Sequence, residues 1–319
     1  LFHPKPTITR AELGTMSKPR IMLLEDRDFF GRELEPALCS NTAYEVRMQG
    51  FWENWKGADI LVCGDRLNFT ATDWVSRPHH CMSLTLHYFE RLSRLWEEGK
   101  PKRIITLGSV GQYPETVGAP LYPELLWDGF PASGRRGLMQ GVLMEHARAY
   151  KEANPEVIVQ HVILDGLYGP GDTFAADSQV IPALIYKFVQ AVLTGAETVT
   201  VYGSGAGAKE TKRNFLHIED AIAGMLLILE KATDSGIINL GSPIGTTVAN
   251  LTRIISSFTG FTGKILYDAT HPDGRPDRTL DTAYMQSLGF APDRRLISSL
   301  GEIIKEYQQQ AVAAAAPSA

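Results

Sequence analysis

The chain has 319 residues, which is enough for a large core in one two-lobed unit, and its 44% hydrophobic and 21% charged residues are ordinary for a globular protein. A net charge of −5 argues against a general nucleic-acid-binding surface, and no apolar run is long enough to cross a membrane. The three cysteines, Cys39, Cys63 and Cys81, lack metal or disulfide spacing, which favours a reducing compartment.

We interpret residues 1–19 as an N-terminal extension. Residue 1 is Leu rather than Met. Therefore either the extension is the start of a mature organellar protein after removal of a transit peptide, or Met16 is the true start and the residues before it are not native to the protein. We expect a soluble intracellular protein, located in the mitochondrial or another organellar matrix or else in the cytoplasm.

The stretch from Ile21 to Gly31 has the layout of a first strand, a tight turn and a helix start. In a dinucleotide-binding fold, glycines in this turn let the backbone approach a pyrophosphate. Here the three glycine positions hold Glu25, Asp28 and Gly31, so two of them are carboxylates. One pair of like charges at about 4 Å costs roughly 4 kcal/mol at an effective dielectric of about 20. The sequence therefore predicts that this turn binds no dinucleotide.

Strand and helix patterns alternate along the first half of the chain, which is typical of a parallel, doubly wound sheet. The expected strands are 20–25, 44–47, 59–63, 103–108 and 157–164, and the expected helices are 29–38, Ser83–Glu98 and Leu138–Lys151. Only 48–58 lies between the second and third strands, about the minimum for a parallel crossover. Gln49 stands where an acidic residue would hold a ribose. We interpret 20–167 as a degenerate Rossmann domain.

From Tyr168 onward the pattern is looser and predicts a smaller lobe. The expected helices are 181–192, 219–231, 248–258 and 298–309, and the expected strands are 198–202, 237–239 and 264–267. We assign 168–310 to this lobe, interleaved with the Rossmann core, and 311–319 to an Ala-rich tail that either extends the last helix or is a loose end. The predicted fold class is α/β: a Rossmann-like doubly wound parallel sheet with a smaller C-terminal α/β substrate lobe.

Four short motifs occur in the second half of the chain. They are Tyr168-Gly-Pro-Gly-Asp172, Val180-Ile-Pro-Ala-Leu184, Arg213-Asn-Phe-Leu-His217-Ile-Glu-Asp220, and Pro272-Asp-Gly274 followed by Leu280-Asp281. In this order they resemble the extended short-chain dehydrogenase/reductase superfamily (NAD-dependent epimerase/dehydratase), and most closely its GDP-L-fucose synthase branch, an NADPH-dependent epimerase–reductase. The resemblance is strong over about 164–307. It is weaker over 20–151, where order and spacing agree but signatures fail.

The resemblance implies a catalytic Tyr-x-x-x-Lys pair, and by spacing these positions fall on Arg136 and Gln140. Arg stays protonated and Gln does not titrate, so neither can replace the original group. Ser109 survives, but a lone serine after a strand is more typical of a cap than of a catalyst. The second serine, the cysteine, the histidine acid and the asparagine before Leu-Tyr-Gly-Pro become Val110, Gly111, Gln179 and Gly166. We predict no catalytic residues and no bound NADP, the cofactor of the family.

Lys187, Tyr202 and Arg213 match positions that, by resemblance, contact the diphosphate or base of a nucleotide sugar. Each has a structural alternative: a solvated helix lysine, a core aromatic and an arginine in an ion pair. His217 is expected to cap the following helix. The adjacent pair His79-His80 lacks further ligands at suitable spacing, so no metal site is expected. Asp273, Asp277 and Asp281 are interpreted as structural.

These losses lead to the hypothesis of a non-catalytic pseudoenzyme that acts as a structural or interaction subunit, for example in a large organellar complex. Two alternatives stay open: an NADP-dependent nucleotide-sugar epimerase/reductase with relocated catalytic groups, and a nucleotide-sugar-binding sensor. By resemblance, the helices Ser83–Glu98 and Leu138–Lys151 form a homodimer contact, or another protein partner occupies that surface.

Overall fold

The structure is a computed structural model that describes residues 18–24, 29–48, 58–64, 76–271 and 276–315. Its first lobe is built on a six-stranded sheet in the order β2-β1-β3-β4-β5-β9, in which every neighbouring pair is parallel. The strands are β1 (Arg20–Leu24), β2 (Glu45–Met48), β3 (Ile60–Cys63), β4 (Arg103–Ser109), β5 (Ile158–Leu164) and β9 (Gly236–Leu240). This sheet confirms the predicted Rossmann-like fold class.

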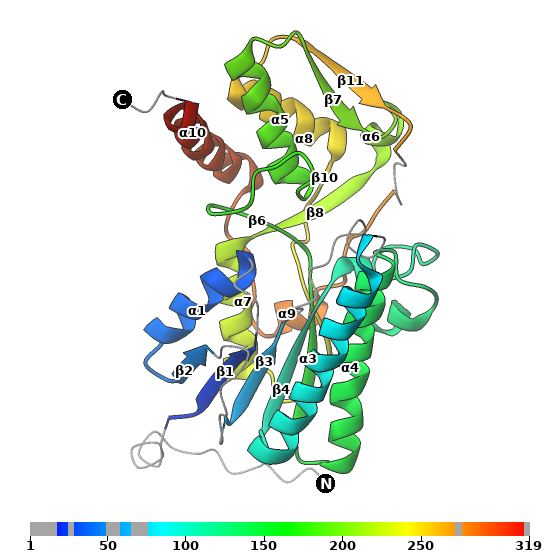
Figure 1. The fold of residues 1–319 in the computed structure, drawn as a ribbon, viewed down its shortest axis with the longest axis vertical. Coiled ribbons are helices and arrows are strands. Elements are labelled where there is room, and N and C mark those ends of the chain that lie inside the picture. Colours follow the sequence, from blue (N-terminus) through cyan, green and yellow to red (C-terminus); the bar gives the residue numbers. More distant parts are fainter. Residues whose placement is uncertain (1–17, 25–28, 49–57, 65–75, 272–275, 316–319) are drawn as a thin grey trace.

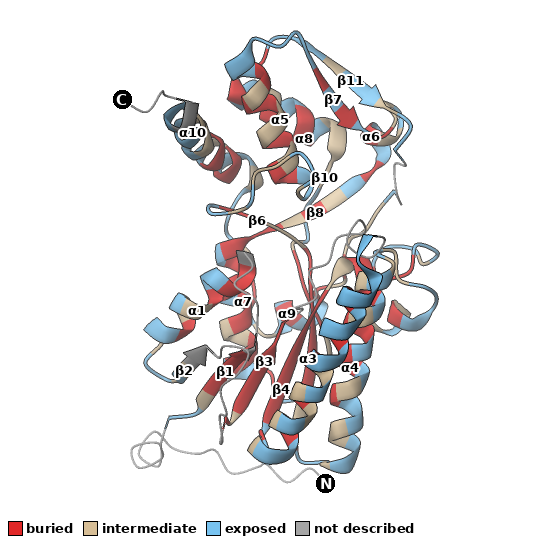
Figure 2. Cartoon of the chain, viewed as in Figure 1, coloured by how far each residue is buried: buried red, intermediate tan, exposed pale blue. Residues whose placement is uncertain are grey.

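Helices cover both faces of this sheet (Figure 1). One face packs against α3 (Pro78–Gly99) and α4 (Arg135–Ala153), and the other against α1 (Phe29–Ser40) and α7 (Ile218–Lys231). Because neither face of the central strands meets water, β1 and β3 are continuous apolar runs, and the polar residues inside β4 and β5 (Thr106, Gln160 and His161) are buried as well. Figure 2 shows the central strands buried, while the outward sides of α3 and α4 are exposed.

The second lobe has a separate core between α5 (Val180–Thr194), α8 (Val248–Thr259) and α10 (Leu296–Ala315). A three-stranded sheet joins it to the first lobe, in the order β10 (Gly245–Thr247), β8 (Lys212–His217) and β6 (Gly166–Tyr168). A parallel pair, β7 (Thr198–Tyr202) with β11 (Lys264–Asp268), lies against α5 at the far end of the lobe (Figure 1). Short helical segments complete the fold: η2 (Val110–Gln112), η3 (Pro123–Trp127), α6 (Gly207–Glu210) and α9 (Ala283–Ser287).

Two elements that the sequence pattern grouped with the second lobe belong to the first. β9 pairs in parallel with β5, and α7 packs against α1 in the core under the large sheet. The chain returns to the first sheet after β8, so the range 168–310, predicted to interleave with the Rossmann core, contributes elements to both lobes; local periodicity cannot reveal which elements return. The strands β6, β8 and β10 and the helices α6 and α9 were also not predicted, since each is short.

Most predicted elements occur with shifted ends. α4 begins three residues before the predicted Leu138 and so includes Arg136, and α3 begins at Pro78 rather than Ser83. The Ala-rich tail extends α10 as far as Ala315. Glu25, Asp28, Gln49 and Asp273 lie outside the described residues. Gly31 lies in α1. None of the described helices is long and apolar enough to cross a membrane.

Candidate functional site

The end of β4 brings together two of the positions at which the family resemblance places catalysis. The Ser109 hydroxyl donates a hydrogen bond to Gln140 Oε1 at 3.0 Å, and Gln140 is only 3% exposed. Ser109 also precedes η2, in the cap position that the sequence suggested. An amide accepts a hydrogen bond but neither takes nor releases a proton at ordinary pH, so this pair offers hydrogen bonding without acid–base chemistry.

The neighbouring positions are equally unlike a proton-transfer site. Arg136 lies in the first turn of α4 and is partly exposed. Gly111 is buried, and a Cβ added there would lie 2.8 Å from the Cβ of Ser133. A cysteine at position 111 would therefore require the Ser133 segment to move. Val110 is half-buried beside it.

Two more of the degenerate positions flank the junction between the lobes. Gln179 is the exposed N-cap residue of α5, and its side chain makes no capping hydrogen bond. Gly166 starts β6, where an added Cβ would lie 3.2 Å from the Asn214 carbonyl oxygen. The structure thus places Gln179 in solvent and leaves little room for a larger residue at 166.

Asp165 is a titratable residue of this region that the sequence reasoning missed. It follows β5 and is 5% exposed, and its Oδ1 accepts from the Gly166 N–H at 2.9 Å. Its Oδ2 has no hydrogen-bond partner among the described residues. Burial raises the pKa of Asp165 to about 8, and hydrogen bonds from the backbone only partly oppose that rise. An acidic residue at the carboxyl end of a buried strand was the available sequence signal.

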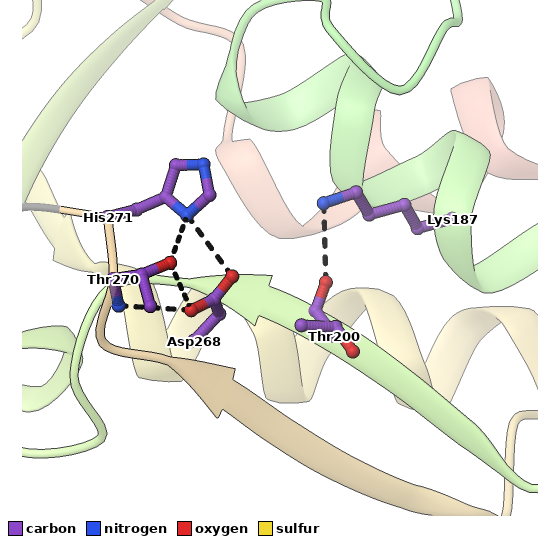
Figure 3. Close-up of polar contacts among 5 residues, drawn as sticks. All are labelled: Lys187, Thr200, Asp268, Thr270 and His271. Atoms are coloured by element: carbon purple, nitrogen blue, oxygen red, sulfur yellow. Dashed lines mark hydrogen bonds and ion pairs between the residues drawn. The ribbon is translucent and has the colours of Figure 1, made fainter.

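In the second lobe, Lys187 and Tyr202 meet as a pair. Lys187 Nζ lies 3.6 Å from the centroid of the Tyr202 ring. The same nitrogen donates to the Thr200 carbonyl oxygen at 3.2 Å (Figure 3). The pKa of Lys187 is lowered by burial, an effect that the nearby Asp268 opposes. Lys187 is therefore neither simply solvated nor buried; its ammonium group is held over an aromatic face.

His271 completes this cluster, and the sequence reasoning did not include it. Its ring stacks on Tyr202 with centroids 3.9 Å apart and planes 12° apart. Its Nδ1 lies 3.2 Å from an Asp268 carboxylate oxygen, as Figure 3 shows. Two groups within 4 Å of one ring centroid cannot share a face, so Lys187 and His271 cover opposite faces of Tyr202. The expected open tyrosine face is thus already occupied by the protein itself.

The remaining predicted residues lie on β8 and in α3. Arg213 is on β8, in a different sheet from Tyr202, and its Nη1 donates to the Lys212 carbonyl oxygen at 2.8 Å. His217 is the N-cap of α7 and its Nδ1 accepts from the Glu219 N–H at 3.3 Å, which confirms the predicted cap. His79 and His80 are exposed at the start of α3, and no group of three metal-ligating side chains occurs within the described ranges.

One cavity of about 1060 Å³ is lined by other residues. The segments 241–246 and 291–298 form most of its wall, together with Phe215 and Phe290. None of Ser109, Gln140, Lys187, Tyr202 or Arg213 lines it. Cavity size alone therefore does not identify the site.

Comparison with known proteins connects this architecture to a family. Residues 67–241 match the family described as NAD dependent epimerase/dehydratase family. A protein of Oryza sativa subsp. japonica named probable GDP-L-fucose synthase 1 is 27% identical over 227 residues, which are 68% of this chain and 65% of that protein. GDP-L-fucose synthase 1 of Arabidopsis thaliana is 34% identical over 142 residues, 44% of this chain and 43% of that protein. The chain thus spans less than two thirds of the length of these relatives.

Solved structures share the same fold. A GDP-L-fucose synthetase from Naegleria fowleri bound to NADP superposes with a TM-score of 0.77 at 17% identity, covering 93% of this chain and 95% of that one. A UDP-glucose 4-epimerase of Thermotoga maritima with UDP-glucose gives 0.74 at 17% identity, covering 92% and 99%. At such identities the likeness shows the fold, a parallel central sheet flanked by helices.

Proposed function

Because this chain belongs to the NAD dependent epimerase/dehydratase family, we propose that it is a nucleotide-sugar-binding protein that does not perform the family's tyrosine–lysine proton transfer. The names of its relatives, which include GDP-L-fucose synthases, favour a GDP-sugar as the ligand. The observation that carries the proposal is the cluster of Lys187, Tyr202 and His271 in the second lobe.

This cluster supplies the two kinds of contact that a nucleotide diphosphate needs. The Lys187 ammonium group has three donors, one of which is used by Thr200, so it retains donors for a phosphate oxygen. A base stacks on Tyr202 by replacing the His271 ring, whose side chain is 47% exposed. Arg213 supplies a further cation from β8, if the ligand reaches across the lobe.

Calorimetric and thermal-shift titrations test this proposal. GDP and GDP-mannose are expected to raise the melting temperature of the wild type by mass action. Lys187→Met is expected to lose the shift and Arg213→Ala to reduce it, while Lys264→Ala, an exposed lysine on β11, serves as the matched control. NAD and NADP are expected to give no saturable heat at millimolar concentration. Absence of any nucleotide effect in the wild type would contradict the proposal.

A second candidate is an active nucleotide-sugar epimerase or reductase with a relocated proton donor. Asp165 favours it, because a carboxyl that stays protonated near neutral pH can act as a general acid. Its 5% exposure weighs against it, since a catalytic acid must reach the substrate. NADPH consumption with GDP-sugars that is lost in Asp165→Asn would establish this candidate.

The subunit hypothesis stays a prediction beside these two. Met82 and Leu86 on α3 and Leu138 and Val142 on α4 are exposed apolar side chains on the surface predicted to meet a partner. Native mass measurement of the protein from its source cell would separate a monomer, a homodimer and a stoichiometric large complex.

A further inference from the structure

Among the described residues, β7 and β11 form a sheet of two parallel strands. β7 packs against α5, and β11 is the outer strand of the second lobe (Figure 1). An edge strand presents a row of backbone N–H and C=O groups with which another strand can pair. Two strands by themselves make a marginal sheet, so a further strand would stabilise this pair.

Alternate residues of β11 turn their backbone groups away from β7. In a parallel ladder, every second residue directs both its N–H and its C=O at the neighbouring strand. The Lys264 N–H donates to the Glu197 carbonyl oxygen at 2.8 Å, and the pairing continues in register to Asp268. Every second residue from Lys264 to Asp268 therefore faces β7, whereas Ile265 and Tyr267 face outward. The N–H and C=O groups of these two residues have no hydrogen-bond partner within the described ranges.

The opposite edge of this sheet is already covered. The same alternation turns Thr200 of β7 away from β11, and its carbonyl oxygen accepts a hydrogen bond from Lys187 Nζ at 3.2 Å (Figure 3). Lys187 belongs to α5, so a side chain of this helix occupies the edge of β7. Within the part of the chain that the structure describes, the open edge is therefore that of β11.

The side chains of β11 are complementary to the same strand turned end for end. In an antiparallel pair of two β11 strands centred on Leu266, Lys264 lies opposite Asp268 of the second copy, and Ile265 lies opposite Tyr267. Opposite charges, and an aromatic ring beside a β-branched side chain, are cross-strand pairs that stabilise a sheet. Leu266 is 48% exposed and lies opposite its own copy, and Tyr267, which is 36% exposed, becomes covered.

The backbone fits the same register. The outward-facing Ile265 and Tyr267 meet the corresponding residues of the second copy as hydrogen-bonded pairs, and Leu266 meets its copy as a non-hydrogen-bonded pair. The two outward N–H groups of each copy thus supply four backbone hydrogen bonds. The Asp268 carboxylate, which also lies beside His271, is 31% exposed, so a lysine of a second copy can reach it.

We propose that β11 pairs antiparallel with β11 of a second copy about a twofold axis at Leu266, so that two chains share a four-stranded sheet. The contact is isologous, because the same strand serves both copies. One pair of five-residue strands buries less surface than a standard interface, so the dissociation constant is expected to be on the order of 10–100 μM. This interface differs from the surface of α3 and α4, and it does not depend on nucleotide binding.

Disulfide trapping tests the register directly. The Cα atoms of a non-hydrogen-bonded pair lie about 4.5 Å apart, which a disulfide can span. Leu266→Cys is made together with Cys39→Ser, because Cys39 is exposed and the other two cysteines are buried. Oxidised glutathione is expected to convert this variant into a covalent dimer. Thr198→Cys, exposed on β7 in the same sheet, is the control and is expected to give at least about tenfold less dimer.

Charge reversal tests the pairing of the strand ends. Lys264→Asp places a carboxylate opposite Asp268 of the second copy, so dimer affinity is expected to fall at least about fivefold. The double variant Lys264→Asp with Asp268→Lys is expected to restore it. Sedimentation velocity between about 1 and 500 μM protein measures the change. At about 1 μM, as in a thermal-shift titration, the chain is expected to be monomeric, so Lys264→Ala remains a valid control for nucleotide binding.

The outcomes separate this dimer from the alternatives. A monomer at every concentration would show that Lys264 blunts the strand edge, and it would overturn the proposal. A dimer that ignores charge reversal and gives no Leu266→Cys disulfide would lie on another surface, such as α3 and α4, and would overturn it as well. Equal trapping of Leu266→Cys and Thr198→Cys would indicate random collision and have the same consequence.

Discussion

The carboxyl end of β4 and the β7–β11 pair both gather polar side chains, but they hold them in opposite states. At the end of β4, the Ser109 hydroxyl donates a hydrogen bond to the buried amide oxygen of Gln140. Beside β7, the Lys187 ammonium group lies over the half-exposed ring of Tyr202. The first arrangement is neutral and enclosed, whereas the second is charged and open to solvent. Ser109 and Gln140 thus satisfy each other within the fold, whereas the Lys187 ammonium group lies over an aromatic face that is half exposed.

The largest effect is expected from replacing Arg103, because its side chain joins elements of the first lobe. This residue is 7% exposed and donates to Gln160 Oε1 and to the carbonyl oxygens of Ile228 and Leu229 at the end of α7. Arg103→Met leaves these acceptors without their donors, so we expect a loss of about 3–5 kcal/mol in the free energy of unfolding. Urea denaturation measures this loss, with the exposed Arg253→Met as control. A loss below about 1 kcal/mol would contradict the structural role.

Replacing Asp165 is expected to give the next largest change in the free energy of unfolding, and this change depends on pH. Its pKa of about 8 in the fold exceeds the unfolded value of about 3.9, so between these values the folded state holds the extra proton. The contribution of Asp165 to stability is therefore fully present below about pH 4 and is lost as pH rises through about 8. Asp165→Asn is expected to flatten this dependence and to be more stable than the wild type at pH 8. The exposed Asp177→Asn is the control, and equal slopes in all three proteins would refute this burial argument.

Replacing His271 in the second lobe is expected to have a smaller effect, which is on nucleotide affinity. Because its ring covers one face of Tyr202, His271→Ala uncovers that face and is expected to strengthen GDP binding about two- to fivefold. Calorimetry measures the change. Tyr202→Leu in the same assay is expected to weaken binding about tenfold. Weaker binding in His271→Ala would show instead that the imidazole itself contacts the ligand.

The smallest expected effect is on catalysis. A variant carrying Arg136→Tyr and Gln140→Lys restores the tyrosine–lysine pair, yet Gly111 and Gln179 keep the cysteine and histidine positions empty. We expect no GDP-fucose formation above background, measured by chromatography of the nucleotide products with NADPH present. The chain that carries only Lys264→Ala serves as the negative control in the same assay. Measurable product would show that the first lobe is closer to an active site than its hydrogen bonds indicate.

The sequence by itself determined the local features of this protein. Strand β7 was predicted with its observed ends, and β4 and β5 to within one residue, because apolar runs between polar boundaries are local signals. The His217 cap was equally accessible, since a cap involves only its own helix. The assignment of the tyrosine and lysine positions to Arg136 and Gln140 rests on spacing along one helix and stays a prediction.

Only the tertiary structure decided the features that depend on long-range pairing. β9 joins the first sheet through β5, about 75 residues away in sequence, and no local pattern carries that information. The same holds for the burial of Asp165 and the covering of Tyr202 by His271. In each case the chemical state of a side chain is set by neighbours brought from distant segments, because desolvation and hydrogen bonding act through space rather than along the chain.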